Sequence, residues 1–278
     1  LRVFPIKEVS DIGRKHNIPL IMDNTASPVI CKPLDHGAAV VVHSLTKFIG
    51  GHGTVIGGCL VDGGNFDWTA DPKRQPLFNE PDASYGGAVW GEVVPQLTGA
   101  NVAFAVRARV CLLRDLGAPL APDNAWGIIQ GLETAPLRMK QHCSNAEKVV
   151  DFLTKHKSVT RVIYPTLHKG TVGDRAKKYF KGGNGALVGI EVKGGVEAGK
   201  KFIEALKMFY HVANIGDARS LAIHPATTTH SQLTEEELLA AGVTPGYVRL
   251  SIGIEHPDDI IADLKQALDA SGKPGLKA

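Results

Sequence analysis

Three short runs of apolar residues in the first sixty positions predict β-strands. They cover residues 18–22, 38–42 and 54–61. Consecutive apolar positions, as opposed to alternating ones, are typical of strands covered on both faces, as in a sheet flanked by helices. A mixture of apolar and charged residues over Val9–His16 predicts a helix before the first run. The pattern therefore favours an α/β fold.

Glycine and proline interrupt residues 62–100 so often that we expect an extended insertion loop there. A loop of that length is usually either functional or disordered. This one carries four aromatic residues, which favour an ordered loop that covers a site or a subunit contact. They are Trp68, Phe78, Tyr85 and Trp90.

The rest of the chain begins with helical patterns and then alternates strands with helices. We expect helices over residues 101–116, 125–132 and 136–156, with Thr134 as N-cap and Pro136 in the first turn of the third. Strands are expected over 159–164, 185–192 and 247–254, and helices over 196–206 and 258–270. The change in character near residue 130 predicts two domains, residues 1–130 and 131–278.

Composition and charge exclude several classes of protein. The 278 residues are 44% hydrophobic and 21% charged, which is typical of a folded globular chain and not of a disordered one. The net charge of +3 gives no reason to expect a nucleic acid as partner. No apolar run approaches the roughly 18–20 residues that a membrane-spanning helix needs, so no membrane partner is expected.

The cysteines and histidines do not form metal-binding patterns. The four cysteines lie far apart, without the paired spacing of a zinc site, and their usage fits a reducing compartment such as the cytoplasm. The histidines also lack a ligand spacing, so no metal site is expected. Residues 224–230 form a polar loop, in which a structural role for the two histidines is favoured over catalysis.

Lys47 follows the second predicted strand and lies between two hydroxyl residues and a glycine-rich run. The segment is His43-Ser44-Leu45-Thr46-Lys47, continued by residues 48–53 (FIGGHG). A desolvated lysine amine is nucleophilic toward an aldehyde, hydroxyls and backbone N–H groups can hold a phosphate, and glycine lets the backbone approach a ligand. The alternative is a solvated lysine beside a glycine-rich turn. The order of residues is not that of a nucleotide-binding P-loop.

Asp23 ends the first predicted strand, about two dozen residues before Lys47. An Asp-Asn-Thr sequence after a strand is by itself more typical of a turn or a helix cap. Pyridoxal 5′-phosphate (PLP) requires a lysine for covalent attachment and commonly a carboxylate beside its pyridinium nitrogen. Two strand ends that supply an aspartate and a lysine suit that cofactor.

Arg249 lies within an apolar strand pattern. A guanidinium keeps its charge, so it must be paired or face a cavity, and a bidentate clamp on a substrate carboxylate satisfies that need. The alternative is an arginine of an edge strand with its head group in water.

Four motifs together resemble the Cys/Met-metabolism family of PLP-dependent enzymes. They are residues 19–25 (PLIMDNT), 43–53 (HSLTKFIGGHG), 213–217 (ANIGD) and 249–255 (RLSIGIE). The resemblance covers essentially the whole chain. Within the insertion, residues 66–68 and 80–85 are more similar to the sulfhydrylase branch of this family than to the cystathionine synthases and lyases.

The resemblance implies the fold type I architecture of PLP-dependent transferases, which is that of aspartate aminotransferase. Residues 1–130 would be the C-terminal portion of the PLP-binding large domain, with the insertion loop, and residues 131–278 a smaller C-terminal α/β domain. Chains of this family begin well before Leu1, so we expect this chain to lack the N-terminal part, as a fragment or as one half of a cleaved protein. That part would supply further strands, an aromatic residue against the cofactor ring and residues donated to a neighbouring subunit.

The same resemblance implies roles for individual residues. Lys47 would bind PLP covalently and then transfer protons, Asp23 would pair with the pyridine nitrogen, and Ser44 and Thr46 would hold the phosphate. Arg249 would bind the α-carboxylate of the substrate.

Two positions differ from related enzymes. Asn214 falls where related lyases carry a serine near the substrate carboxylate, and it is assigned a supporting role in substrate binding. Gly86 stands where the family usually has histidine.

The implied reaction is a γ-replacement on O-acetylhomoserine by sulfide or a thiol, which gives homocysteine or methionine and acetate. Cystathionine γ-synthase or methionine γ-lyase activity on the same scaffold is the alternative enzyme. A non-catalytic half-chain that completes a site with a separate N-terminal chain is the alternative of another class. The expected partners are the amino-acid substrate, the thiol and further copies of the chain, as a dimer of dimers.

Overall fold

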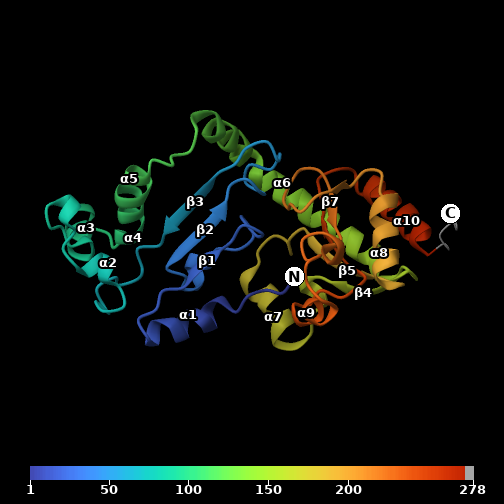
Figure 1. Ribbon diagram of the computed structural model, residues 1–278, viewed down its shortest axis with the longest axis horizontal. Helices are drawn as coiled ribbons and strands as arrows, with labels where there is room; N and C mark the ends of the chain where they lie inside the picture. Colours follow the sequence, from blue (N-terminus) through green and yellow to red (C-terminus); the bar gives the residue numbers. More distant parts are fainter. Residues whose placement is uncertain (273–278) are drawn as a thin grey trace.

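Two separate β-sheets, joined by one long helix, organise the chain in the computed structural model, which describes residues 1–272 (Figure 1). The first sheet contains β1 (Ile21–Asp23), β2 (Val40–Ser44) and β3 (Gly58–Asp62) and follows helix α1 (Ile6–Lys15). The three predicted strands and the first helix are thereby confirmed, with shorter strands. Together with the second sheet and its helices, the architecture is the mixed α/β class that the sequence predicts.

The register of the first sheet brings two predicted site residues to the same face. β1 runs parallel to β2, with Asp23 opposite Val42, and β2 runs antiparallel to β3, with Ser44 opposite Gly58. Paired residues share a face of a sheet, and so do residues two apart on one strand. Asp23 and Ser44 therefore project from the same face.

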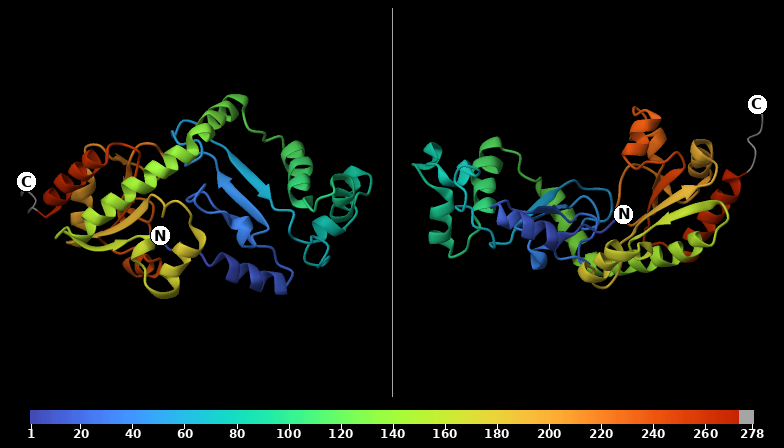
Figure 2. Two further views of the ribbon diagram at one scale, coloured as in Figure 1. Left: turned by 180° about the vertical axis from the view of Figure 1, so that it is seen from behind. Right: turned by 90° about the horizontal axis from the view of Figure 1, so that it is seen from below.

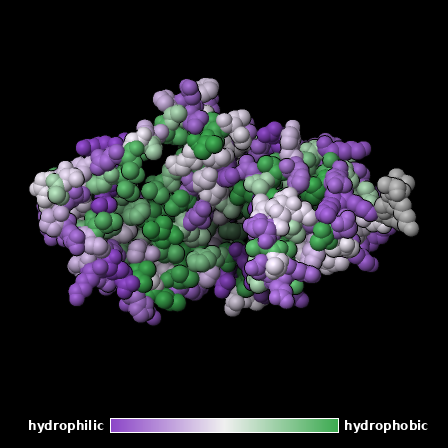
Figure 3. Space-filling model, viewed as in Figure 1, coloured by the Kyte–Doolittle hydropathy of each residue, from purple (hydrophilic) through white to green (hydrophobic). Residues whose placement is uncertain are grey.

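The expectation that both faces of this sheet are covered is wrong for its outer strands. Ile21, Leu60 and Val61 are 45%, 46% and 42% exposed, and hydrophobic residues gather over this half of the molecule in Figure 3. Leu60 and Val61 project to opposite faces because they are neighbours on one strand. With only three strands, the sheet has an open edge at β1, and only the central β2 begins in a buried cluster.

Residues 62–100, predicted to be a loop, contain two helices, α2 (Pro76–Asn79) and α3 (Trp90–Thr98). The helix predicted over residues 101–116 is confirmed as three consecutive segments: α4 (Ala103–Arg107), a π-helical turn (Ala108–Leu113) and α5 (Arg114–Leu116). The loop prediction is wrong for α3, which forms despite Gly91 and Pro95. Aromatic packing explains the helix: Trp90 is buried in one cluster with Phe66 and Trp68, and its ring nitrogen donates to Asp82 at 2.9 Å.

The helical stretch after this insertion is one helix, α6 (Pro122–Thr154), and the predicted break at Thr134–Pro136 is wrong. Pro136 lies inside α6, where its missing N–H leaves one backbone hydrogen bond of the helix unmade. Thr134, however, does not cap a new helix: its hydroxyl donates to the carbonyl of Gly131 at 3.3 Å and accepts from Arg138 at 3.2 Å. The expected domain boundary at residue 130 lies inside α6 and stays a prediction.

The second sheet has five strands in the order β4-β5-β8-β7-β6. Its strands are β4 (Val159–Ile163), β5 (Leu187–Val192), β6 (Tyr210–His211), β7 (Leu221–Ile223) and β8 (Tyr247–Ser251). The helices of this half are α7 (Gly170–Tyr179), α8 (Gly195–Ala205), α9 (Glu235–Ala240) and α10 (Pro257–Ser271). The strands and helices predicted for this half are confirmed, and α7, α9, β6 and β7 are present in addition to those predicted.

One continuous core lies between the five-stranded sheet and the helices α6, α8 and α10, which pack beside one another (Figure 2). Phe202 from α8, Leu250 from β8 and Leu264 from α10 are all fully buried in it. Among the described residues, no helix is long and apolar enough to cross a membrane.

Candidate active site

The carboxyl end of β1 and the end of β2 are tied together by hydrogen bonds. The backbone N–H of Thr25 donates to the Asp23 carboxylate at 2.8 Å, and the Thr25 hydroxyl accepts from the backbone N–H of Ser44 at 2.8 Å. One carboxylate oxygen of Asp23 and the Ser44 hydroxyl have no hydrogen-bond partner among the residues that the structure describes. Both groups are therefore available to a ligand at this edge, where α/β sheets bind ligands.

Lys47, Asn214 and Arg249 lie together. The Lys47 amine donates to the side-chain carbonyl of Asn214, and the Arg249 guanidinium donates to the backbone carbonyl of the same asparagine at 3.3 Å. A tight turn carries Lys47, because its backbone N–H donates to the carbonyl of Ser44 at 3.3 Å. That turn connects this cluster to the Asp23–Ser44 edge.

Thr46 has a different environment from the one predicted for it. Its hydroxyl accepts from the backbone N–H of Gly57 at 3.1 Å and lies 3.3 Å from the carbonyl of that glycine. These contacts fix the start of β3 against the Lys47 turn. Contact of Thr46 with a phosphate stays a prediction, and it requires the hydroxyl to redirect its proton.

The charge of Arg249 has no carboxylate partner within residues 1–272. Burial lowers the pKa of its guanidinium from the ordinary value, although the nearby Tyr247 acts in the opposite direction. The pKa of the Tyr247 phenol is raised, chiefly by burial. A partly desolvated, unpaired guanidinium is a strong site for an anionic group, above all for a carboxylate that it can bind through two N–H groups.

Asp23 and Arg249 line different cavities. A cavity of about 270 Å³ lies between the end of β1 and the segment before β5, with Asp23, Ser27 and Asn184 in its wall. Another, of about 310 Å³, is lined by Arg249, Tyr247, Thr229 and His230. In residues 1–272 these two predicted site residues therefore line separate cavities, and Lys47 lines neither of the two.

The two histidines of the polar loop differ in burial: His224 is buried and His230 is half-buried. His224 is fully buried, and its ring nitrogens contact the Thr227 hydroxyl at 2.9 Å and the Pro245 carbonyl at 2.8 Å. Burial lowers its pKa, which favours the neutral ring. These contacts suit the structural role that the sequence favoured. No group of three or more metal-ligating side chains occurs in the described part of the chain.

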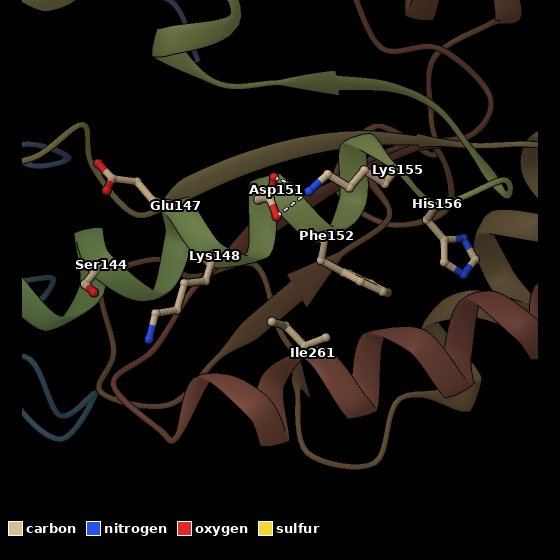
Figure 4. Close-up of a pocket in the computed structure, with 8 residues that line it drawn as sticks. All are labelled: Ser144, Glu147, Lys148, Asp151, Phe152, Lys155, His156 and Ile261. Atoms are coloured by element: carbon tan, nitrogen blue, oxygen red, sulfur yellow. Dashed lines mark hydrogen bonds and ion pairs between the residues drawn. The ribbon is translucent and has the colours of Figure 1, made fainter.

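A larger open pocket of about 770 Å³ lies on the outer side of α6, against α10 (Figure 4). Phe152 and Ile261 form its apolar part, and Lys155 pairs with Asp151 at 2.7 Å beside it. Both partners of this ion pair are about 70% exposed, so the pair is screened by solvent. None of the predicted site residues lines this pocket.

Sequence reasoning missed Arg138, which binds the backbone of the Lys47 turn from helix α6. Arg138 is 6% exposed and donates to the carbonyls of Phe48 at 2.7 Å and Ile49 at 2.8 Å. A signal was present: Arg138 falls on the apolar stripe of α6, three residues after Ala135 and one before Met139. The argument that an arginine among apolar residues must be paired, which identified Arg249, applies to it equally.

Comparison with known proteins agrees with this arrangement. A sequence model of the Cys/Met metabolism PLP-dependent enzyme family matches residues 1–269. An O-acetyl-L-homoserine sulfhydrylase of Leptospira meyeri is 53% identical over 96% of the chain, and a homocysteine synthase of Schizosaccharomyces pombe is 45% identical over 95% of it. In both cases the chain spans 61% of the length of the relative.

Solved structures give the same result. A Campylobacter jejuni protein described as an O-acetylhomoserine (thiol)-lyase, which contains a pyridoxyl-lysine, matches with a TM-score of 0.85 and 43% identity. The match covers 95% of this chain and 62% of that one. A cystathionine γ-synthase of Xanthomonas oryzae matches with a TM-score of 0.75 and 31% identity over 98% of this chain and 60% of that one. The chain therefore belongs to the Cys/Met metabolism PLP-dependent enzyme family and has the fold type I architecture of its relatives.

Proposed function

We propose that this chain supplies the reactive lysine and the substrate-binding arginine of a PLP-dependent enzyme that performs γ-replacement on O-acetylhomoserine. The observation that carries the proposal is the convergence of Lys47 and Arg249 on Asn214. An amine that can attack an aldehyde and an unpaired guanidinium that can bind a carboxylate are what an amino-acid substrate and PLP together require. The names and identities of the relatives from Leptospira meyeri and Schizosaccharomyces pombe support the same reaction.

The residues that are present fit the cofactor. Asp23 has a free carboxylate oxygen for the pyridine nitrogen, and the unpartnered hydroxyl of Ser44, on the same face of the sheet, suits a phosphate oxygen. Lys47 follows three residues later, with a neutral amide as its only side-chain partner in residues 1–272. When bound, PLP supplies an electron sink that stabilises negative charge at the substrate α-carbon.

Each residue then has a definite task. Asp23 keeps a proton on the ring nitrogen, and Ser44 holds the phosphate, with Thr46 as a further donor. Arg249 binds the α-carboxylate and so orients the substrate, Asn214 positions both Arg249 and Lys47, and Lys47 takes the α-proton. In the overall reaction the Cγ–O bond of O-acetylhomoserine breaks, acetate leaves, and a Cγ–S bond forms with sulfide or a thiol.

Substitution of Lys47 tests this proposal. We expect Lys47→Arg, which keeps the charge but cannot attach PLP, to abolish thiol-dependent formation of homocysteine from O-acetylhomoserine and sulfide by the whole enzyme. Lys32→Ala, at an exposed lysine outside the site, is the matched control and should leave turnover unchanged. Unchanged turnover in Lys47→Arg would refute the proposal.

The second candidate is a cystathionine γ-synthase or methionine γ-lyase, favoured by the 31% identity and TM-score of 0.75 to the Xanthomonas oryzae protein. The two reactions differ in what replaces the leaving group. Release of a ketoacid and ammonia, independent of added thiol, would favour the lyase. Formation of a thioether from cysteine in preference to sulfide would favour the synthase.

The chain spans 61% of its Leptospira meyeri relative, so we also propose that the complete site requires further polypeptide, from a longer chain or from a partner chain. We expect a homo-oligomer, built as a dimer of dimers in the cytoplasm. The exposed apolar residues Trp126, Ile129 and Leu132 on α6, which are 68%, 55% and 53% exposed, support further contacts on this helix.

A further inference from the structure

The Arg138 guanidinium is a buried cation whose hydrogen-bond acceptors are all uncharged oxygen atoms. Its guanidinium donates to the carbonyls of Phe48, Ile49 and Gly131 at 2.7, 2.8 and 2.7 Å and to the Thr134 hydroxyl at 3.2 Å. No carboxylate within residues 1–272 pairs with it, and burial lowers its pKa. Burial of an unpaired charge is costly, so these four hydrogen bonds must compensate for its lost hydration.

The carbonyls that Arg138 binds belong to the two residues directly after Lys47. The turn is closed further by hydrogen bonds from Gly51 to the Lys47 carbonyl at 2.7 Å and from Gly50 to the Leu45 carbonyl at 2.8 Å. Glycine allows close approach at two positions, and at Gly51 the backbone φ of 76° also favours it. A Cβ at Gly51 would lie 2.0 Å from the Arg138 guanidinium, and one at Gly131 would lie 2.3 Å from the Gly50 carbonyl.

The same turn holds the segment that carries Asn214. The backbone N–H of Ala218 donates to the Gly51 carbonyl at 2.8 Å, and a Cβ at Gly216 would lie 2.6 Å from the backbone nitrogen of Phe48. The segment around Asn214 is therefore seated directly on the turn that Arg138 fixes. Displacement of that turn would move Lys47 and its partner Asn214 relative to each other.

We propose that Arg138 is a positioning residue that holds the Lys47 turn, and through it the Lys47–Asn214 contact, in the geometry in which the lysine reacts. The inference rests on the role of Lys47 proposed above. A planar guanidinium can reach three carbonyls in fixed directions, whereas a lysine ammonium at the same position is a point charge on a flexible stem. The specific geometry of arginine is therefore required in addition to its charge.

The test compares Arg138→Met and Arg138→Lys with Leu153→Ala, all in the full chain. Leu153 is a fully buried residue of the same helix that lies in the core of the five-stranded sheet, away from the turn, so it controls for general loss of stability. The first measurement is hydrogen exchange of the backbone amides of residues 45–51, which needs no cofactor. Arg138→Met should lose protection in this segment, and Leu153→Ala should retain it under conditions where both variants are folded.

The second measurement is the rate at which PLP is captured on Lys47, trapped with borohydride and quantified by mass spectrometry relative to capture on Lys32. We expect capture on Lys47 to slow by about tenfold or more in Arg138→Met, because misplacement of a reacting group by a fraction of an ångström has effects of this size. Arg138→Lys should recover part of the rate, and Leu153→Ala should stay within about twofold of the unsubstituted chain.

Unchanged exchange protection in Arg138→Met, or an equal slowing of capture in Leu153→Ala, would overturn the proposal. A different result is expected if the proposed function itself is wrong. In that case the unsubstituted chain captures no PLP on Lys47, while the exchange measurement still shows whether Arg138 holds the turn.

Discussion

The two sheets differ in how completely residues 1–272 cover them, and the lysine that we propose to react follows a strand of the less covered sheet. The three-stranded sheet carries Asp23, Ser44 and Lys47 at its ends, yet its outer strands expose Leu60 and Val61 by more than 40%. The five-stranded sheet packs on three helices around fully buried residues and supplies Arg249 from its central region. Lys47, which we propose to be the reactive lysine, thus comes from the open half, and Arg249, which we propose to bind the substrate, comes from the closed half.

Helix α6 joins these two halves physically. Its middle holds the Lys47 turn through Arg138, and its C-terminal part lies in the core of the five-stranded sheet through Leu153. Between them, His142 donates a ring N–H to the Ile252 carbonyl just after β8 and packs edge-on to Phe48, with ring centroids 5.3 Å apart. The geometry of the site therefore depends on packing in the closed half.

The largest difference is expected between the truncation of a large apolar side chain in the closed half and the truncation of one in the open half. Phe202→Ala should lower the free energy of unfolding by about 3–5 kcal/mol because it leaves a cavity in the core of the closed half. Leu60→Ala should cost less than about 1 kcal/mol because Leu60 is 46% exposed. Urea titrations measure both values, and equal losses would contradict the comparison between a closed and an open sheet.

The next largest effect is a pH dependence of stability caused by His142, the buried histidine of α6. Burial lowers the pKa of His142 to about 4, with the nearby Arg138 acting in the same direction. The unfolded chain binds this proton at a higher pH than the folded chain does, so the stability that the neutral ring contributes is present above pH 6.5 and lost as the pH falls from 6.5 to about 4. The loss is on the order of 3 kcal/mol.

His142→Gln, which cannot titrate, should flatten the pH dependence of the unfolding free energy across that interval. The slope is the measurement, since the substitution also changes packing at neutral pH. A slope equal to that of the unsubstituted chain would mean that His142 does not titrate differently in the two states. In that case the His142 ring would be less well buried than the structure indicates.

The smallest effect is expected at the contact between α1 and α7, which also connects the two halves. The Tyr179 hydroxyl donates to Glu8 at 2.6 Å and accepts from the backbone N–H of Lys7 at 3.1 Å. Tyr179→Phe removes both bonds and should cost about 1 kcal/mol. Thermal unfolding with Lys15→Ala, at an exposed position of α1, as control measures it. Equal thermal stability of these two variants would mean that the Tyr179 hydrogen bonds do not stabilise the packing of α1 against α7.

The fold could be predicted to the extent that local patterns determine it. The apolar runs located β1, β2 and β3, and the amphipathic pattern located α10, because periodicity reflects burial directly. The patterns failed where tertiary contacts outweigh local preference. Arg138 and Thr134 keep α6 continuous past Pro136, and the aromatic cluster around Trp90 makes a helix of a segment that is rich in glycine and proline.

The candidate site was accessible to sequence reasoning for a different reason. Lys47, Asp23 and Arg249 are chemically conspicuous at strand ends or within an apolar strand, and the structure brings Lys47 and Arg249 together on Asn214. The engagement of Thr46 with Gly57 and the three-carbonyl clamp of Arg138 depend on residues distant in sequence. No spacing rule could identify them, although the position of Arg138 on an apolar stripe was a signal.

The central claim is that Lys47 is the residue that carries PLP. The most direct measurement is to incubate the chain with PLP, reduce it with borohydride and locate the pyridoxyl group by mass spectrometry. We expect a long-wavelength absorption band before reduction and a pyridoxyl group on Lys47 afterwards. A pyridoxyl group distributed over exposed lysines, with none enriched on Lys47, would contradict it.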